Sequence, residues 1–221
     1  FRGTERLLLG RWPNLDAPDG GYATIDSASA SAITDHELPA GDWTGAVQSV
    51  TAFHCPGKEI PMTIKVGDRV PEGKFAVMIN GAPGSISTQE LFGGKKVVFF
   101  SVPGAFTPTC SNSHLPGYVK NAAEIKAKGV ATIACMSVND VFVMDAWGKD
   151  RGVGDRILML ADGNAEYTRA LGLELDGSGF GLGTRSQRFS MVVDDGVVTE
   201  LNVEAPREFK VSTAECVLKQ L

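Results

Sequence analysis

Residues 95–110 read KKVVFFSVPGAFTPTC, and this stretch decides the fold. Its first half, Lys95 to Val102, is a short β-rich run that is apolar on both faces, which is typical of a strand in the centre of a sheet. A turn rich in Pro and Gly follows, and residues 109–128 then predict a helix that ends at Gly129. The stretch therefore predicts a cysteine, Cys110, where a central strand passes through a turn into a helix.

The residues that follow, together with those from Met62 to Lys95, continue this alternation. Further strands are predicted at 75–79, 130–138, 157–161, 188–193 and 197–202, the last two as a hairpin that turns at residues 194–196. Further helices are predicted after a cap at Ser87, at 140–149, at 165–171, and from Ser212 or Thr213 to Leu221. Strands that alternate with helices and then end in a hairpin predict a three-layer α/β domain with a mixed central sheet flanked by helices.

Residues 1–61 have a different pattern from the domain predicted at 62–221. They are rich in Gly, Ala, Ser, Asp and Pro and show no sustained period of 2 or 3.6, so we expect an irregular N-terminal extension. Arginines around the leucines at 7–9 hint at an organelle-targeting segment, although several acidic residues argue against a transit peptide through the whole stretch; an unstructured tail is the alternative. Because the chain opens at Phe1, we expect it to be processed, truncated or read from an incomplete frame.

The composition excludes several classes of function. With 43% hydrophobic residues, the 221-residue chain can bury a core. A net charge of -5 and the lack of a Lys/Arg block argue against a nucleic-acid partner, and no apolar stretch approaches the roughly 20 residues that span a bilayer. We expect a soluble protein of the cytoplasm or an organelle matrix, the mitochondrion or plastid if residues 1–61 contain a targeting segment.

The cysteine pattern points to thiol chemistry. The chain has four cysteines, Cys55, Cys110, Cys135 and Cys216. They are too few and too widely spaced for a disulfide scaffold, and they form no CxxC pair that would suggest zinc. We expect a reducing compartment, one or two working thiols, and neither a metal nor another cofactor.

Cys110 has the surroundings of a reactive thiol. A helix N-terminus carries partial positive charge, which stabilises a thiolate over a thiol. The neighbours of Cys110 also meet the requirements for reaction with a peroxide. When a thiolate attacks one peroxide oxygen, negative charge develops on the other, so hydrogen-bond donors must surround the sulfur and the peroxide, and water must be excluded. Thr107 can hold its hydroxyl near the sulfur, and Pro103 and Pro108 shield and stiffen the loop without adding N–H groups.

A cation from elsewhere in the fold would complete such a site. Arg188, which opens the predicted strand 188–193 after a Gly-rich approach, is the candidate, with Arg185 as a possible brace. The alternatives for Cys110 are a buried structural thiol, a cysteine protease or hydrolase, and a metal ligand paired with His114. The last two are disfavoured because no second Cys/His pair follows and the other two histidines lie in the extension.

Residues 103–118, PGAFTPTCSNSHLPGY, resemble the active-site signature of peroxiredoxins, in particular the type II or peroxiredoxin 5-like branch, with its Pro, three residues, Thr, two residues and Cys. Further matches are SVND at 137–140, AW at 146–147, LAD at 160–162, RFSM at 188–191 and LNVE at 201–204. The resemblance spans about Ile64 to Leu221 and implies a thioredoxin-like fold. It implies that Cys110 is the peroxidatic cysteine, that Thr107 hydrogen-bonds the sulfur and the peroxide, that Pro103 shields the site, and that Arg188 polarises both reactants.

The sequence leaves open how a sulfenic acid on Cys110 is resolved, a step that must precede further oxidation. The separation of Cys135 from Cys110 matches the resolving cysteine of some type II peroxiredoxins, but Cys135 also reads as a small residue filling a buried strand. In that case the first helical turn would have to unwind, because the two Cα atoms must come within about 7 Å. The alternative is direct reduction by glutaredoxin or glutathione with no internal disulfide, and thioredoxin is a further candidate reductant of the enzyme. Cys216 reads as an ordinary thiol on the last helix, and Cys55 has no assigned role.

Three functions share this predicted fold, and the fold does not choose among them. The first is a thiol-dependent peroxidase that reduces hydrogen peroxide and organic hydroperoxides in antioxidant defence. The second is a peroxide sensor or redox relay that passes oxidation to a partner, and the third is an interaction module with an incidental cysteine. The resemblance also implies a homodimer, to which Phe106, Tyr118 or Trp147 would contribute apolar area unless they belong to the core.

Overall fold

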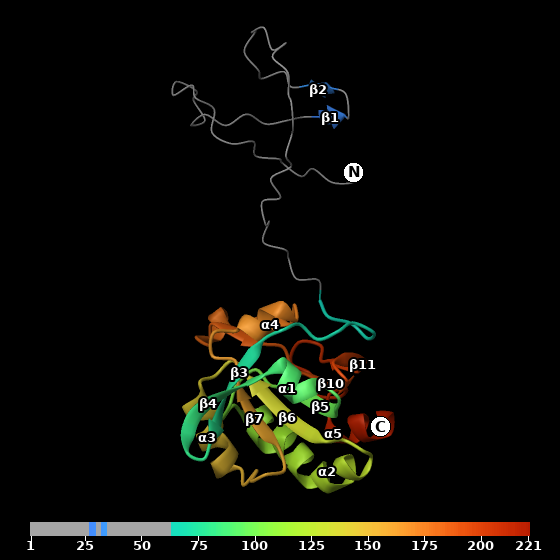
Figure 1. Cartoon of the computed structure of the whole chain (residues 1–221). Helices are drawn as coiled ribbons and strands as arrows, with labels where there is room; N and C mark the ends of the chain where they lie inside the picture. Colours follow the sequence, from blue (N-terminus) through green and yellow to red (C-terminus); the bar gives the residue numbers. More distant parts are fainter. Residues whose placement is uncertain (1–26, 30–31, 35–62) are drawn as a thin grey trace. The chain divides into compact units, whose positions relative to one another are not determined.

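The computed structural model of this chain describes residues 27–29, 32–34 and 63–221 (Figure 1). The first two ranges are the strands β1 (Ser27–Ser29) and β2 (Ala32–Thr34), which pair antiparallel. The sequence does not predict this pair, because the stretch lacks the period of two that marks a half-buried strand. The targeting segment suggested around residues 7–9 lies outside the described residues.

A mixed sheet of seven strands forms the centre of residues 63–221, in the order β11-β10-β5-β6-β7-β3-β4. Its strands are β3 (Lys74–Ile79), β4 (Ala82–Ser87), β5 (Lys96–Ser101), β6 (Thr132–Ser137), β7 (Leu158–Ala161), β10 (Phe189–Asp194) and β11 (Val197–Val203). The three central strands β5, β6 and β7 run parallel, while every other pairing is antiparallel. The predicted mixed sheet is confirmed.

Helices cover both faces of this sheet (Figure 1). They are α1 (Thr88–Phe92), α2 (Leu115–Ala127), α3 (Val141–Asp150), α4 (Glu166–Ala170) and α5 (Ala214–Gln220). Phe100 of β5 packs in one core with residues of α2, α3 and α5, whereas its neighbour Phe99 packs in a second core with residues of α1 and α4. Successive side chains of a strand point to opposite faces, so a strand that is apolar at every position needs a cover on both sides. β5 is therefore the central strand that its sequence predicts, and the three-layer prediction is confirmed.

Three features differ from the sequence expectation. Strand β4 was not predicted, although Asn80 and Gly81 before it adopt the positive φ values of a tight hairpin turn. A small antiparallel pair, β8 (Glu174–Asp176) and β9 (Thr184–Ser186), encloses the 3₁₀ turn η2 (Ser178–Phe180). The single helix expected at 109–128 begins with a π-helical turn, η1 (Cys110–His114), before α2.

The π-helical turn has a local cause. Leu115 donates its backbone N–H to the carbonyl of Cys110, five residues back, and the next residue, Pro116, has no N–H to donate. A regular α-helical ladder therefore cannot run unbroken through this point. The consequence is that Cys110 lies in a wider, less regular turn than the sequence predicts.

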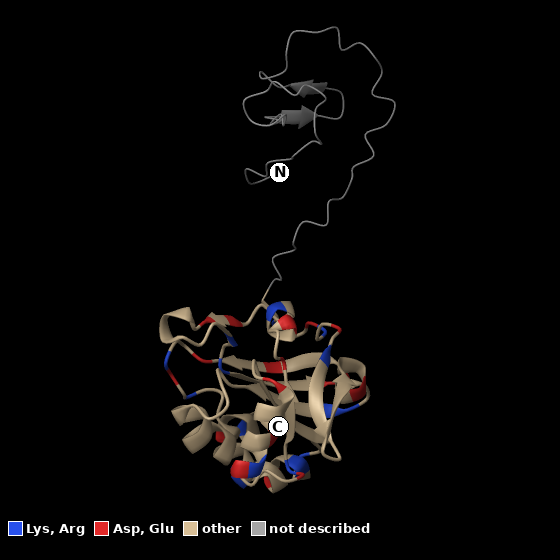
Figure 2. Cartoon of the chain, turned by 90° about the vertical axis from the view of Figure 1, so that its left-hand side faces the viewer, with Lys and Arg blue, Asp and Glu red and all other residues tan. Residues whose placement is uncertain are grey.

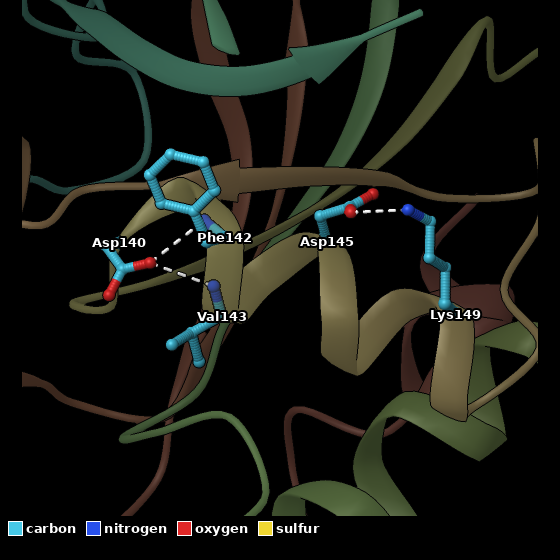
Figure 3. Close-up of polar contacts among 5 residues, drawn as sticks. All are labelled: Asp140, Phe142, Val143, Asp145 and Lys149. Carbon is cyan, nitrogen blue, oxygen red and sulfur yellow. Dashed lines mark hydrogen bonds and ion pairs between the residues drawn. The ribbon is translucent and has the colours of Figure 1, made fainter. Parts of the chain in front are cut away.

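The predicted helix starts at Ser87 and Asp140 are confirmed. Ser87 and Glu90 form a capping box, and the Asp140 carboxylate accepts from the backbone N–H groups of Phe142 and Val143, at 2.9 Å each (Figure 3). In the same helix, α3, Lys149 pairs with Asp145 at the surface at 2.6 Å (Figure 3).

Acidic and basic side chains are interspersed over the domain (Figure 2). In the part of the chain that is described, no helix is long and apolar enough to cross a bilayer.

Candidate active site

The loop after β5 is held in place by the ends of the neighbouring strands. Val102 donates its N–H to the carbonyl of Met136 in β6, at 3.1 Å. The Oδ1 atom of Asn139, just after β6, accepts from the N–H of Ala105 at 3.0 Å and from the Ser137 hydroxyl at 2.8 Å. Phe106 has a φ of 61°, a conformation that non-glycine residues rarely adopt. The loop is thus fixed by the backbone of β6 and by the side chain of Asn139 before it reaches Cys110.

Cys110 is fully buried, and the guanidinium of Arg188 reaches its sulfur. The Nη2 atom of Arg188 lies 3.4 Å from Cys110 Sγ. Arg188 directly precedes β10, and β10 pairs with β5 so that Phe189 lies opposite Ser101. This pairing carries the arginine across 78 residues of sequence to the loop that leads to Cys110. The pairing thus brings a permanently charged guanidinium into contact with the buried sulfur of Cys110.

His114 provides the second anchor of the Arg188 guanidinium. Its Nε2 atom lies 3.0 Å from the carbonyl oxygen of Ser212, which can only accept, so Nε2 carries the proton. Nδ1 is then free to accept from Nη1 of Arg188, 3.0 Å away. Burial, with the charge of Arg188 as a second cause, lowers the pKa of His114 to about 3, against a weaker opposite effect of the Ser212 bond. The imidazole is neutral at pH 7 and leaves the positive charge of Arg188 available to the sulfur.

The other predicted site residues, Pro103, Thr107 and Arg185, are all half-buried, and the side-chain hydrogen bonds of Thr107 and Arg185 go to backbone carbonyls. Pro103 and Thr107 are both half-buried in the loop. The Thr107 hydroxyl donates to the carbonyl of Gly104 at 2.9 Å, which leaves its oxygen as an acceptor. Arg185 donates to the carbonyls of Val138 at 2.8 Å and Leu182 at 2.8 Å, so its hydrogen bonds go to backbone beside the site rather than to Cys110 or Arg188.

The remaining described cysteines have no contact with Cys110 at hydrogen-bond distance. Cys135 is fully buried in β6, opposite Phe100 of β5. Burial raises the pKa of the Cys135 thiol well above its usual value; the negative charge of Cys110 acts in the same direction and Arg188 acts against it. Cys216 is half-buried on α5 and donates to the carbonyl of Lys210 at 3.2 Å, whereas Cys55 lies outside the described residues. Within residues 63–221 and the two short strands before them, no group of three or more His, Cys, Asp or Glu could hold a metal ion.

Comparison with known proteins identifies the family. The Redoxin family model matches residues 65–218. Peroxiredoxin-2B of Arabidopsis thaliana is 51% identical over 159 residues, which cover 72% of this chain and 98% of that protein. This chain is a type II peroxiredoxin.

Further comparisons agree with this assignment. Peroxiredoxin-2E, chloroplastic, of Arabidopsis thaliana is 46% identical over 166 residues, 73% of this chain and 71% of that one. Among solved structures, reduced Prx3 in complex with H₂O₂ from Vibrio vulnificus is similar with a TM-score of 0.69 and 54% identity, over 72% of this chain and 99% of that one. The peroxiredoxin domain accordingly has the thioredoxin-like fold, and the chain is a thiol-dependent peroxidase with an antioxidant function. The sensor or relay reading is not favoured.

Sequence reasoning missed several residues that support this peroxiredoxin site. Ser212 holds His114, Asn139 holds the loop, and the hydroxyl of Ser111 accepts from the indole N–H of Trp147 at 3.0 Å in the core. Asn139 lies within the SVND match at 137–140, but its side chain has no role in the site predicted from the sequence. Nothing in the linear pattern of Ser212 distinguishes it from other serines, because its contact uses the backbone carbonyl.

Proposed function

We propose that Cys110 is the peroxidatic nucleophile, with Arg188, Thr107 and Pro103 completing its site. The observation that supports this proposal is the distance of 3.4 Å between Arg188 Nη2 and the Sγ atom of Cys110, which lies at the start of η1. The guanidinium carries a permanent charge and has a second donor, Nη1, tied to His114. It is therefore held in place before any substrate arrives, which is the condition for electrostatic stabilisation of a transition state.

The reaction follows from these positions. The Cys110 thiolate attacks the hydroxyl oxygen of the peroxide, so that an S–O bond forms while the O–O bond breaks. The negative charge moves to the departing oxygen, which takes a proton and leaves as water or an alcohol. Arg188 stabilises that developing charge, the Thr107 oxygen accepts from the peroxide hydroxyl, and Pro103 keeps water away. Cys110 is left as a sulfenic acid.

Resolution of the sulfenic acid requires the first turn of the helix to open. Cys110 has no exposed surface, so a second thiol can reach it only if η1 unwinds. Cys135 is itself buried in the centre of the sheet and held as a thiol, which makes it a poor nucleophile in this conformation. These facts favour direct reduction by an external thiol, that is, by thioredoxin, glutaredoxin or glutathione, over an internal Cys110–Cys135 disulfide.

Two experiments test this function. Peroxide consumption with thioredoxin, glutaredoxin or glutathione as the reductant should be abolished by Cys110→Ser and strongly reduced by Arg188→Ala or Thr107→Val; full turnover in Cys110→Ser would overturn the proposal. Peptide mass mapping after one equivalent of peroxide should find the sulfenic acid or a mixed disulfide on Cys110. A Cys110–Cys135 crosslink would instead establish the internal route.

We also propose that this peroxiredoxin forms a homodimer through the face around the active-site loop. Phe106 in that loop is 50% exposed, whereas Tyr118 and Trp147, the other two residues considered for this role, are fully buried and belong to the core. Sedimentation of the full chain should give twice the monomer mass, and Phe106→Ser should weaken the association. A monomer at micromolar concentration would contradict this proposal.

A plastid location is the third proposal. Peroxiredoxin-2E-2, chloroplastic, of Oryza sativa is 43% identical over 206 residues, which cover 91% of this chain and 92% of that protein, so the match reaches into the first sixty residues. Residues 1–61 fused to a fluorescent protein should direct it to plastids. Import into mitochondria would refute the assignment.

A further inference from the structure

A single carboxylate closes the loop between β11 and α5. The Oε1 atom of Glu204 accepts from three successive backbone N–H groups, those of Lys210 at 2.7 Å, Val211 at 2.8 Å and Ser212 at 2.8 Å. It also accepts from the Ser212 hydroxyl at 2.9 Å. Glu204 is buried, and its other oxygen, Oε2, has no partner among the residues described. All hydrogen bonding of this side chain is therefore directed at the loop that ends in Ser212.

The loop closed by Glu204 contacts the groups that hold Arg188. The Ser212 carbonyl accepts from Nε2 of His114 at 3.0 Å and from the Tyr118 hydroxyl at 2.9 Å. The ring of Phe209 lies 4.9 Å from the His114 ring and 5.5 Å from the guanidinium carbon of Arg188. The position of the loop thus decides which nitrogen of His114 carries the proton, and it places the Phe209 ring over the Arg188 guanidinium.

Glu204 also touches the backbone of the arginine itself. Its N–H donates to the carbonyl of Arg188 at 2.9 Å, at the end of the β10–β11 ladder. The residue therefore lies where the two supports of Arg188, the strand and the loop, meet. Burial would raise the pKa of the Glu204 carboxyl, but the hydrogen bonds from Ser212, Lys210 and Val211 outweigh burial and lower it. The carboxylate is charged at neutral pH and keeps its four donors.

We propose that Glu204 is a positioning residue of the peroxidase site, which acts through Ser212 and His114 to hold the Arg188 guanidinium against Cys110 Sγ. This rests on the proposed role of Cys110 as the nucleophile. Without the carboxylate, Ser212 loses its two bonds to Glu204, and the Tyr118 hydroxyl alone does not fix the direction of the Ser212 carbonyl towards His114. Nδ1 is then no longer fixed as the acceptor of Arg188. The guanidinium loses its second anchor and no longer meets the departing oxygen in a fixed orientation.

The test compares peroxide reduction with alkylation of the same thiol. Iodoacetamide and peroxide both reach the buried Cys110 only through a transient opening of η1, so access affects both reactions. Iodoacetamide needs no guanidinium to stabilise a departing oxygen, so the ratio of the two second-order rate constants isolates the contribution of Arg188 to that step. Glu204→Ala should lower this ratio about tenfold, the lower end of the effect that residues supporting metal ligands have on activity. Glu204→Gln, which keeps an acceptor for the loop, should restore most of it. Nitrogen NMR of His114 should show the Nε2–H tautomer in the unaltered protein and Glu204→Gln, and a mixture in Glu204→Ala.

Matched controls separate positioning from simple stabilisation. Glu208→Ala removes an exposed carboxylate of the same loop and should leave the ratio unchanged. In a His114→Phe background, Glu204→Ala should have no further effect on the ratio. If Glu204→Ala does not fold, Glu204→Asp, which withdraws the carboxylate by one methylene, should lower the ratio in the same direction.

An unchanged ratio in the folded Glu204 variants, with only a lower melting temperature, would overturn the proposal. So would an equal loss in the His114→Phe background, because Glu204 would then act independently of His114. If Cys110→Ser retained peroxidase activity, the proposed function itself would fail, and that result is separate from either of these.

Discussion

Acidification should lower the unfolding free energy of this peroxiredoxin through His114, and the substitution His114→Phe should remove that contribution. The folded protein lowers the pKa of His114 from 6.5 to about 3, so the unfolded chain binds a proton there at a pH where the folded chain does not. Stability from this group is fully present above pH 6.5 and is lost progressively as the pH falls from 6.5 towards 3. A pH of 5 lies about 1.5 units below the pKa of 6.5 in the unfolded chain, and each unit corresponds to about 1.4 kcal/mol. The loss of unfolding free energy relative to pH 7 is therefore about 2 kcal/mol.

Urea unfolding followed by tryptophan fluorescence can measure this loss. The free energy of unfolding would be determined at pH 7 and pH 5 for the unaltered chain and for His114→Phe, at one protein concentration. Phe keeps an aromatic ring against Phe100 and Phe209 but has no titrating nitrogen. Acidic residues and the other two histidines are common to both proteins, so their contributions cancel in the difference between the two pH effects.

The unaltered chain should lose about 2 kcal/mol more than His114→Phe between pH 7 and pH 5. Equal losses in the two proteins, within about 0.5 kcal/mol, would refute the reasoning, since a linear extrapolation resolves a difference of 2 kcal/mol for a domain of ordinary stability. Such a result would mean that His114 is protonated in the folded protein. The tautomer argument for the Arg188 anchor would then fail with it.

Three further predictions concern single side chains. Ser111→Ala leaves the buried indole N–H of Trp147 without its acceptor and should lower the unfolding free energy by about 1–3 kcal/mol in urea, whereas no change would mean that another acceptor replaces the hydroxyl. Asp140→Ala removes the cap of α3 (Figure 3) and should cost about 1 kcal/mol, while Lys149→Ala, which breaks a surface pair on the same helix, should cost less than about 0.5 kcal/mol; equal costs would contradict the capping argument. Arg188→Lys keeps the charge but loses one of two anchored nitrogens, so stopped-flow peroxide reduction should slow at least about tenfold, and full activity would show that charge alone suffices.

Most of the helices and strands could be predicted from the sequence, because apolar patterns and helix caps depend on residues that are close together in the chain. The run of apolar residues at 95–102 predicts a strand covered on both faces, and β5 is that strand. Ser87 and Asp140 mark helix starts by their own side chains. The π-helical turn at Cys110 was missed because a hydrogen-bond shift of one residue leaves no mark in apolar periodicity. Strand β4 was missed because Pro83 and Gly84 weaken its strand pattern.

The sequence by itself predicted the chemistry available to this protein, since a cysteine at a helix start after Pro103 and Thr107 has the local surroundings expected of a reactive thiol. The tertiary structure alone decided which residues contact that thiol and how they are oriented. Arg188 reaches Cys110 only because β10 pairs with β5, and its orientation depends on His114, which is 74 residues away in sequence. His114 in turn depends on a backbone carbonyl, that of Ser212, whose place is set by Glu204. Contacts between distant residues, and those made by backbone atoms, leave no pattern in a linear sequence.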